Sequence, residues 1–300
     1  MRKSLMLALL VFMAIIAGCS SSPDDKIEVT KQLFAAQDKA MPFEIKVSEN
    51  NKAVKGLHIK VELSMAKMDH GTYNATLTEG KAGFYAGKMK LPMTGKYEAA
   101  FSFEKGGKKT EKVIDLNVKR PAGVALINGK WITNEDVNFY KFINYLQLAI
   151  NREAAEKKYH GKQLDEELAY LQSQEKSAED KNQILTQIIR LRAMGLIAEE
   201  KGYTATDAEV NKELGTIRDQ YKQIKSAEAM IHAYNDAKFW DIEKRQYKLI
   251  VLTQKVQQDL IAQAQKENPK AGVQEIDYEA QQKYEDLLVS QVNSLKIEIL

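Results

Sequence analysis

The spacing of the apolar residues changes once along the chain, near Arg120 and Pro121. Before this point, from residue 26 to residue 118, apolar and polar residues alternate, which is typical of half-buried β-strands. After it, no proline occurs until Pro269, and apolar residues recur every three or four positions, which is typical of helices. The sequence therefore predicts two domains of different classes, a β domain over 26–118 and a helical domain over 122–300.

The alternating half predicts six or seven short strands, with a turn sequence about every ten residues. Clear turns are Asn50-Asn51 and Gly106-Gly107. This strand number and spacing favour an antiparallel β-sandwich of the immunoglobulin-like type. The residues expected to face its core are Phe43, Ile45, Val47, Ile59, Val61, Leu63, Met65, Tyr97, Ala99, Phe101, Phe103, Ile114, Leu116 and Val118.

Capping boxes indicate where the helices of the second half begin. In a capping box, a Ser or Thr hydroxyl satisfies backbone donors while an acid three residues later reaches back. Thr133, Ser177 and Thr206 are each followed by such an acid, so each predicts a helix start, the first of them opening a helix to about Tyr159. Further helices are expected near residues 165–174, 227–235, 241–267 and 277–293.

The N-terminus has the composition of a targeting segment. Two basic residues precede the apolar run Leu5–Ala17, which is shorter than the roughly 20 residues that span a bilayer and fits a signal peptide. The small residues before Cys19 resemble the lipobox of bacterial lipoproteins, which implies a signal peptide over 1–18, a lipidated linker over 19–25 and a mature protein anchored on the extracytoplasmic face of the cell membrane. The alternative is an ordinary secretory signal with an accidental cysteine.

Charge and composition exclude several classes of function. Removal of the signal peptide lowers the formal net charge from +3 to +1, and a near-neutral chain is a poor partner for nucleic acid. The sequence has no Gly-rich phosphate loop, and its four histidines are scattered over both halves. We therefore expect a binding protein and not an enzyme.

Two segments of the helical half, Val124–Val137 and Ile184–Leu214, resemble the N-terminal chaperone domain of the SurA and PrsA family of extracytoplasmic folding factors. The likeness rests on the tripeptide Asn128-Gly129-Lys130 before the first long helix, on a helix that ends at Lys201-Gly202, and on the helix start at Thr206–Val210. It implies an all-α domain in which the chain's closing residues form a strand that pairs back with the strand before the first helix.

The family commonly carries a parvulin peptidyl-prolyl isomerase module before its last helix, but here only the 11 residues Glu267–Asp277 stand in that place. The resemblance therefore implies binding of unfolded or secreted polypeptides without catalysis, in an apolar cleft between helices. The alternative is that these side chains are core packing. The candidate polypeptide-binding residues are Phe139, Tyr140, Tyr145, Met194, Phe239 and Trp240, with Trp131, Met230 and Tyr234 as further candidates.

Residues 40–118 resemble the YtkA-like family, to which FixH, a protein associated with copper oxidase assembly, is related. The likeness rests on Met68-Asp69-His70 after a strand and on the order of residues in Gly83–Phe101. Thioether and imidazole groups suit Cu(I), so the candidate metal ligands are Met68, His70 and Met93. Strand alternation places Met65 in the core instead, and the alternative for the whole segment is a structural loop that binds no metal.

Together these patterns predict an α+β multidomain lipoprotein that acts as an extracytoplasmic chaperone or holdase. The alternatives are a copper-handling metallochaperone and a scaffold for an envelope complex, both acting through the β domain. No cofactor other than Cu(I) is expected.

Overall fold

The computed structural model describes residues 25–65 and 71–300, and the chain divides into two compact units between Pro121 and Ala122. The division falls where the apolar period changes, so the prediction of a β domain followed by a helical domain is confirmed. Cys19 and the predicted signal peptide lie outside the described residues. Of the helices within the described ranges, none is both long and apolar enough to cross a membrane.

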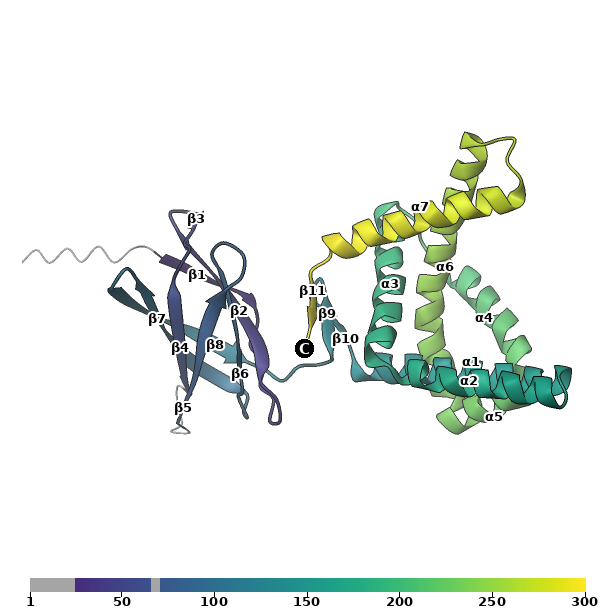
Figure 1. Cartoon of the computed structure of the whole chain (residues 1–300), viewed down its shortest axis with the longest axis horizontal. Coiled ribbons are helices and arrows are strands. Elements are labelled where there is room, and N and C mark those ends of the chain that lie inside the picture. The colour runs from purple at the N-terminus through teal and green to yellow at the C-terminus, as the bar shows by residue number, and fades with distance from the viewer. Residues whose placement is uncertain (1–24, 66–70) are drawn as a thin grey trace, which may run out of the picture. The chain divides into compact units, whose positions relative to one another are not determined.

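The first unit is an antiparallel sheet in which the strands follow the order β1-β2-β6-β5-β4-β7-β8, with β3 against β2 (Figure 1). Its strands are β1 (Asp25–Lys31), β2 (Met41–Glu49), β3 (Lys52–Ala53), β4 (His58–Met65), β5 (Thr72–Glu79), β6 (Phe84–Met89), β7 (Gly95–Lys105) and β8 (Lys108–Val118).

The sheet is continuous and curved into a half-barrel, which corrects the expectation of two separate immunoglobulin-like sheets. Strand β5 joins the two parts, because its residues from Thr72 to Leu77 pair with β4 whereas Thr78 and Glu79 pair with β6. Alternation in the sequence fixes which face of a strand is buried but does not encode the partner of that strand.

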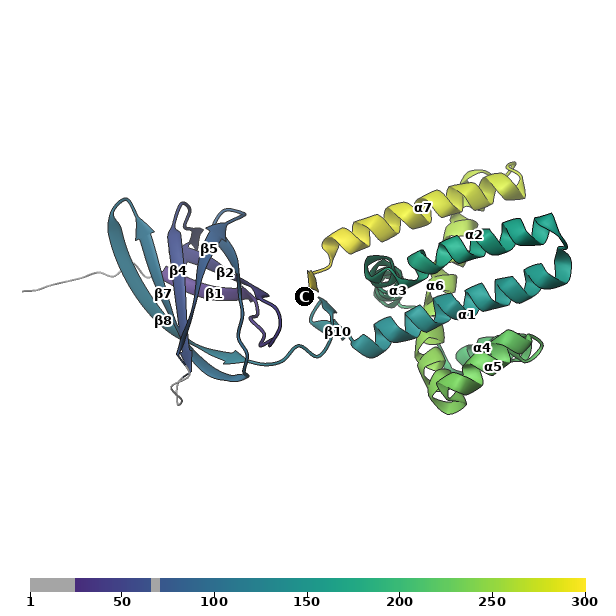
Figure 2. The same cartoon turned by 60° about the horizontal axis from the view of Figure 1, so that its bottom comes forward.

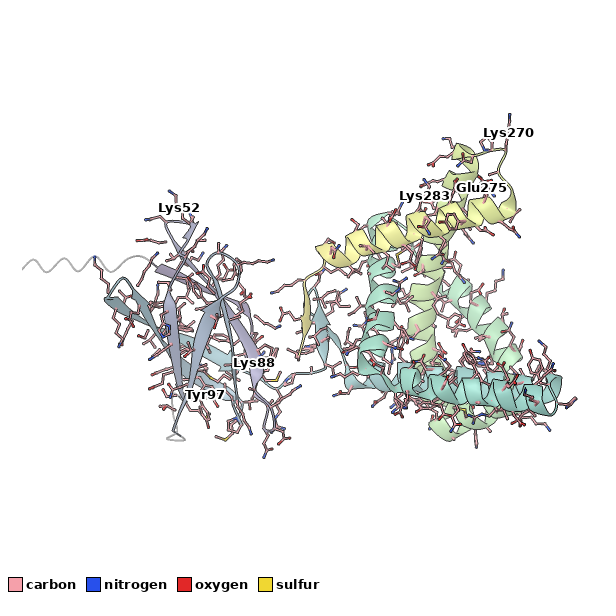
Figure 3. All side chains as sticks on the ribbon, in the orientation of Figure 1. Lys52, Lys88, Tyr97, Lys270, Glu275 and Lys283 are labelled. Atoms are coloured by element: carbon pink, nitrogen blue, oxygen red, sulfur yellow. The ribbon has the colours of Figure 1, made fainter. Side chains whose placement is uncertain are left out.

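The core of the half-barrel consists of the residues that alternation predicts, with exceptions at the strand ends and edge. Phe43, Tyr97 and Phe101 are almost fully buried (Tyr97 is labelled in Figure 3). Met65 and the two apolar residues Ile114 and Leu116 of β8 are only partly buried. β8 is an edge strand, so one of its sides has no neighbouring strand to cover it.

The second unit combines a small three-stranded sheet with seven helices (Figure 2). Its elements are β9 (Ala125–Ile127), β10 (Lys130–Ile132), α1 (Asn134–Lys158), α2 (Lys162–Glu179), α3 (Lys181–Glu200), α4 (Asp207–Lys222), α5 (Lys225–Tyr234), α6 (Asp236–Glu267), α7 (Val273–Ser294) and β11 (Ile297–Ile299).

The two ends of the second unit meet in this sheet, whose order is β10-β9-β11. Ile297 of β11 pairs with Ile127 of β9, which confirms the expected return of the closing strand and adds β10 to it. Asn128 stabilises the pairing of β9 with β11, since its side-chain oxygen accepts a hydrogen bond from the Lys296 amide at 2.9 Å. Gly123 is required beside this hairpin, because a Cβ there would lie 2.1 Å from the carbonyl oxygen of Ile132.

Two of the three predicted capping boxes are present. Thr133 caps α1 with Asp136, and Thr206 caps α4 with Glu209. The predicted helix start at Ser177 is wrong, because α2 continues through this residue and Asp180 is the N-cap of α3. Asp180, the acid three residues after Ser177, is itself the N-cap, so α3 begins about one turn later than predicted.

The helices pack around α3 and α6 (Figures 1 and 2). One apolar core joins α3, α6 and α7, and a second joins α1, α5 and α6. Lys283 of α7 binds Glu267 at the end of α6 at 2.8 Å (Figure 3). Helix α6 therefore contributes to every large core of the helical unit except the one beneath the small sheet.

Candidate functional site

A cavity of about 200 Å³ lies among α1, α3, α4 and α6. It is called the Glu243 cavity here. Residues four positions apart share one face of a helix, so α1 presents Phe139 and Ile143 to the cavity together, and α6 presents Glu243 and Tyr247. The complete lining is Phe139, Tyr140, Ile143, Leu191, Tyr221, Glu243, Gln246, Tyr247 and Ile250.

Glu243 is the acidic group of this cavity, and the residue is 6% exposed. Among the described residues its carboxyl group makes no hydrogen bond or ion pair. Burial disfavours the charged form and raises the pKa of Glu243 to about 7. A carboxyl group that changes charge near neutral pH therefore faces a wall that is aromatic and aliphatic apart from Gln246.

Three tyrosines share the environment of Glu243. Burial, and secondarily the charge of Glu243, raises the pKa of Tyr221 to about 12. The same two causes raise the pKa of Tyr247. The hydroxyl of Tyr140 donates to the side-chain oxygen of Gln246 at 2.9 Å, so it is already satisfied without Glu243. The phenols therefore stay neutral at physiological pH and present polarisable rings to the cavity.

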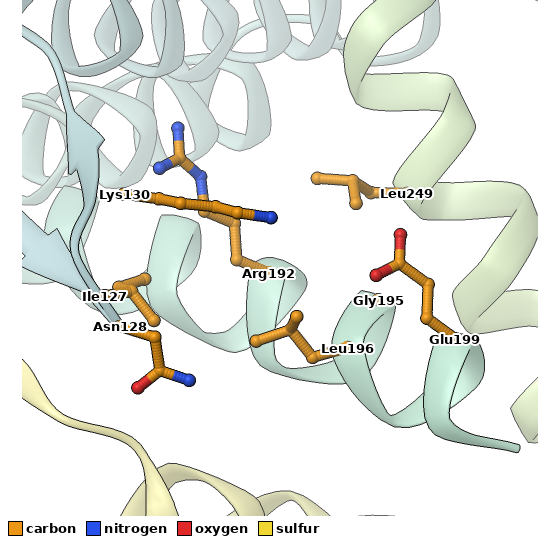
Figure 4. Close-up of a pocket in the computed structure, with 8 residues that line it drawn as sticks. All are labelled: Ile127, Asn128, Lys130, Arg192, Gly195, Leu196, Glu199 and Leu249. Atoms are coloured by element: carbon orange, nitrogen blue, oxygen red, sulfur yellow. The ribbon is translucent and has the colours of Figure 1, made fainter.

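A second cavity, of about 220 Å³, lies between the β9–β10 hairpin, α3 and α6 (Figure 4). It is called the Gly195 cavity. A Cβ at Gly195 would lie 2.7 Å from the Leu249 side chain, so glycine leaves the space open. Ile127, Leu196 and Leu249 form apolar walls, while the charged side chains of Lys130, Arg192 and Glu199 and the amide of Asn128 complete the lining.

The predicted polypeptide-binding residues fall into two groups. Phe139, which is 1% exposed, and Tyr140 line the Glu243 cavity, and their role in binding stays a prediction. Met194 and Phe239 are 0% exposed, so they are corrected to core residues that offer no surface to a partner. Apolar residues at helical spacing give the same sequence pattern whether another helix or a ligand covers them. The sequence alone therefore could not distinguish the cavity-lining residues from the core residues.

Tyr145 and Trp240 are partly exposed but already engaged. The Tyr145 hydroxyl donates to Glu179 at 2.5 Å. The Trp240 ring packs under the Arg218 guanidinium, 4.5 Å from the ring centroid. Of the further candidates, Tyr234 packs on Phe142 with ring centroids 4.5 Å apart.

The α6 wall of the Glu243 cavity was not predicted from the sequence. It consists of Glu243, Gln246, Tyr247 and Ile250. The stretch Glu243–Lys248 is rich in charged and polar residues and suggests a solvated face. The sequence does carry one indication that Glu243 is buried. Glu243 stands four residues after Phe239 and four before Tyr247, within an apolar stripe. An acid in such a stripe is a candidate buried group.

Of the three candidate copper ligands, Met68 and His70 lie outside the described residues. Met93 is partly buried in the turn before β7, and its carbonyl oxygen accepts a hydrogen bond from the Tyr97 hydroxyl at 3.0 Å. The methyl group of Met65 packs against Gly95, where a Cβ would lie 2.7 Å from it. Within residues 25–65 and 71–300, no group of three or more His, Cys, Asp or Glu is placed to hold a metal ion.

The two ends of the 66–70 segment nevertheless lie near Met93. The segment leaves β4 at Met65, which pairs with Tyr97, and it re-enters the sheet at β5, where the Tyr73 ring stands edge-on to Tyr97 with centroids 6.3 Å apart. The end of β4, the start of β5 and the turn that holds Met93 are therefore at the same end of the half-barrel.

The fold defines a two-domain α+β protein with an N-terminal antiparallel β domain. Residues 23–101 match the YtkA-like family, so the chain carries a YtkA-like domain. The match ends inside β7, and the structure extends the sheet beyond it by the rest of β7 and by β8.

The other comparisons add little. A search of curated proteins found no match. Among solved structures, the X-ray structure of the endo-beta-1,4-mannanase from Thermotoga petrophila aligns at 14% identity and a TM-score of 0.22, over 34% of this chain and 21% of the mannanase. The chain thus aligns with about a fifth of the mannanase's length.

The pKa of Glu243 predicts a pH-dependent stability. The carboxyl group has a pKa of 4.5 in the unfolded chain and about 7 in the folded chain, so the folded chain binds the extra proton between these values. The free energy of unfolding should therefore fall as pH rises through this window, by about 3 kcal/mol in total, and stay low above it. Glu243→Gln should remove most of this dependence. The measurement is denaturant unfolding of the protein at about pH 5 and about pH 8, followed by the helical circular dichroism signal.

The control is Glu199→Gln on the exposed rim of the Gly195 cavity. Equal pH dependence in wild type and Glu243→Gln would contradict the prediction.

Proposed function

We propose that this chain is a membrane-anchored extracytoplasmic lipoprotein whose helical unit holds unfolded or assembling polypeptides, as a chaperone or holdase. The observation that carries the proposal is the pair of apolar-walled cavities, of about 200 and 220 Å³, on a single helical unit. Each is large enough for one side chain. Unfolded clients expose the aromatic and aliphatic side chains that such cavities accept.

The composition of the walls supports binding of varied clients. Tyrosine and leucine side chains supply apolar contact area, and the charged rim of the Gly195 cavity allows polar contacts with a client backbone. Further exposed apolar side chains, Tyr278 and Val289, lie on α7. Binding at several weak sites suits a holdase, because many shallow contacts add up without one specific sequence.

The connection between α6 and α7 supports binding without isomerisation. Helix α6 ends at Glu267 and α7 begins at Val273, so residues 268–272 link them directly. This link stands where folding factors of the SurA and PrsA type commonly carry a parvulin module. In the proposal, the chain acts on its clients by sequestering them, and the YtkA-like domain stands between the lipid anchor and the helical unit in the sequence.

The proposed anchor is a diacylglyceryl group on Cys19. Two acyl chains give stable attachment where one chain is marginal. In cells fed a clickable palmitate analogue, the wild-type chain should carry the label and Cys19→Ser should lose it, whereas the neighbouring variant Ser22→Ala should keep it. Label retained in Cys19→Ser would contradict the anchor.

The holdase activity is tested by aggregation of a chemically denatured client. The chain without its signal peptide should suppress the light scattering of the client at a few-fold molar excess. Leu196→Asp places a carboxylate in the apolar wall of the Gly195 cavity. Because a bound client would desolvate this charge and would lose the apolar contact with Leu196, suppression of client aggregation should weaken about tenfold.

The matched control is Lys181→Asp, which puts the same residue in the exposed first turn of α3, where the helix dipole favours an acid. No suppression by the wild-type chain would overturn the proposal. Crosslinking in native membranes provides a second criterion, because one stoichiometric partner in place of a client set would favour an envelope-complex scaffold.

A copper-handling function of the YtkA-like domain is the second candidate, favoured by the position of Met93 beside the ends of the 66–70 segment. Thioether and imidazole ligands prefer Cu(I). Titration with Cu(I) against a competing chelator should give one bound ion per chain. Met68→Ala, His70→Ala and Met93→Ala should each weaken binding about tenfold, corresponding to roughly 1.4 kcal/mol. Met230→Ala in the helical unit is the control, and unchanged affinity in all three variants would exclude this site.

A further inference from the structure

Within the part of the chain that the structure describes, Glu243 forms no ion pair with a basic side chain. Several of the basic groups on the elements around it are engaged elsewhere. Arg192 of α3 binds Asp136 at 2.9 Å and the Trp131 carbonyl oxygen at 2.7 Å. On α4, the Arg218 guanidinium lies over Trp240. The two cations that follow Glu243 on α6 pair with other acids, Lys244 with Asp207 and Arg245 with Asp241 and Glu135.

An unpaired carboxylate in an apolar wall is unfavourable. Burial without a partner costs several kcal/mol for a charged group, and removal of one partner from a buried pair has a similar cost. A cation that enters the cavity would convert this unfavourable contact into an ion pair shielded from water. Cation binding therefore has a driving force at Glu243 that it lacks at the exposed acids of the helical surface.

The rest of the wall also suits a cation on an apolar stem. The rings of Phe139, Tyr140, Tyr221 and Tyr247 line the same cavity, and the faces of aromatic rings attract ammonium groups. Three aliphatic side chains complete the apolar lining: Ile143, Leu191 and Ile250. The volume of about 200 Å³ is many times the roughly 15 Å³ that is enough to hold one water molecule, so a chain of several methylenes fits.

We propose that the Glu243 cavity binds a primary ammonium group carried on a short methylene stem, with the ammonium paired to the Glu243 carboxylate and the stem against the aromatic wall. A lysine side chain has this chemistry, as does a free alkylamine. The lysine source rests on the proposed function, in which an unfolded polypeptide occupies the helical unit. The cavity then gives that unit a preference for lysine next to apolar residues.

The first experiment compares three six-carbon probes that differ only in their head group: hexylammonium, hexanol and hexanoate. Each is titrated into the full chain without its signal peptide, with binding followed by NMR. Hexylammonium should bind at least about tenfold more tightly than hexanol, and hexanoate should bind most weakly. Glu243→Gln should reduce the ammonium preference to about unity, whereas Glu243→Asp, which keeps the charge, should restore part of it. Glu199→Gln in the Gly195 cavity should leave the preference unchanged.

Equal affinity for the ammonium and the alcohol in wild type would overturn the proposal, as would a preference that survives Glu243→Gln or disappears in Glu199→Gln. The helical circular dichroism signal of each variant shows that it is folded, and Glu243→Asp keeps the test valid if Glu243→Gln unfolds.

A second experiment separates the two sources of the ammonium group. Aggregation suppression is measured with one denatured client before and after acetylation of its lysines. Weaker suppression of the acetylated client, in wild type but not in Glu243→Gln, supports the lysine source. Equal suppression of both clients by wild type overturns the lysine source and leaves the proposed function intact. Hexylammonium binding with no suppression of either client would instead overturn the proposed function and identify the ligand as a free amine.

Discussion

One partly buried carboxylate, that of Asp136, connects three elements of the helical unit. It accepts hydrogen bonds from the Thr133 amide at 2.7 Å and from Arg192 at 2.9 Å, and Arg192 in turn donates to the Trp131 carbonyl oxygen at 2.7 Å. This network joins the end of β10, the first turn of α1 and the middle of α3. Both charged side chains are only about one-fifth exposed, at 21% and 23%, so their attraction is less screened than that of a surface pair.

Both cavities are lined in part by the elements that this network connects. Helix α1 carries Phe139 and Tyr140, and α3 carries Leu191 towards one cavity and Gly195 towards the other. The same pair of helices, α3 and α6, therefore contributes to two cavities of different character. One is lined by aromatic rings and has an unpaired acid, and the other is aliphatic with charges at its rim. In the proposed function, this difference gives a single unit two kinds of selectivity.

The YtkA-like half offers a candidate site of a different kind. Its core is a set of alternating side chains in one curved sheet, and its chemically distinctive residues are at one end of that sheet, where Met65 and Met93 flank Gly95. Side chains at strand ends and turns can vary without disturbing the ladder of hydrogen bonds, which is why binding groups often collect there. A binding function of this half and one of the helical half can therefore be tested separately.

Much of the fold followed from local sequence. Apart from the return of the closing strand to β9, which the family resemblance implied, the two periods predicted the two domains, and the pairs Thr133/Asp136 and Thr206/Glu209 predicted helix starts. These features were predictable because period and capping depend on residues within one or two turns of each other. At Ser177 the same local rule failed, since Asp180 supplied a competing cap.

The sequence by itself thus determined the class of each domain, the direction of most buried side chains and the shortness of the segment between the last two helices. Only the tertiary structure decided that β5 joins the sheet into one half-barrel, that Met194 and Phe239 are core residues, and that Glu243 faces a cavity. The physical reason is that a pattern along one helix or strand defines its apolar face but not what covers it. Which element covers that face depends on contacts between residues far apart in the chain, such as the hydrogen bond between Tyr140 and Gln246.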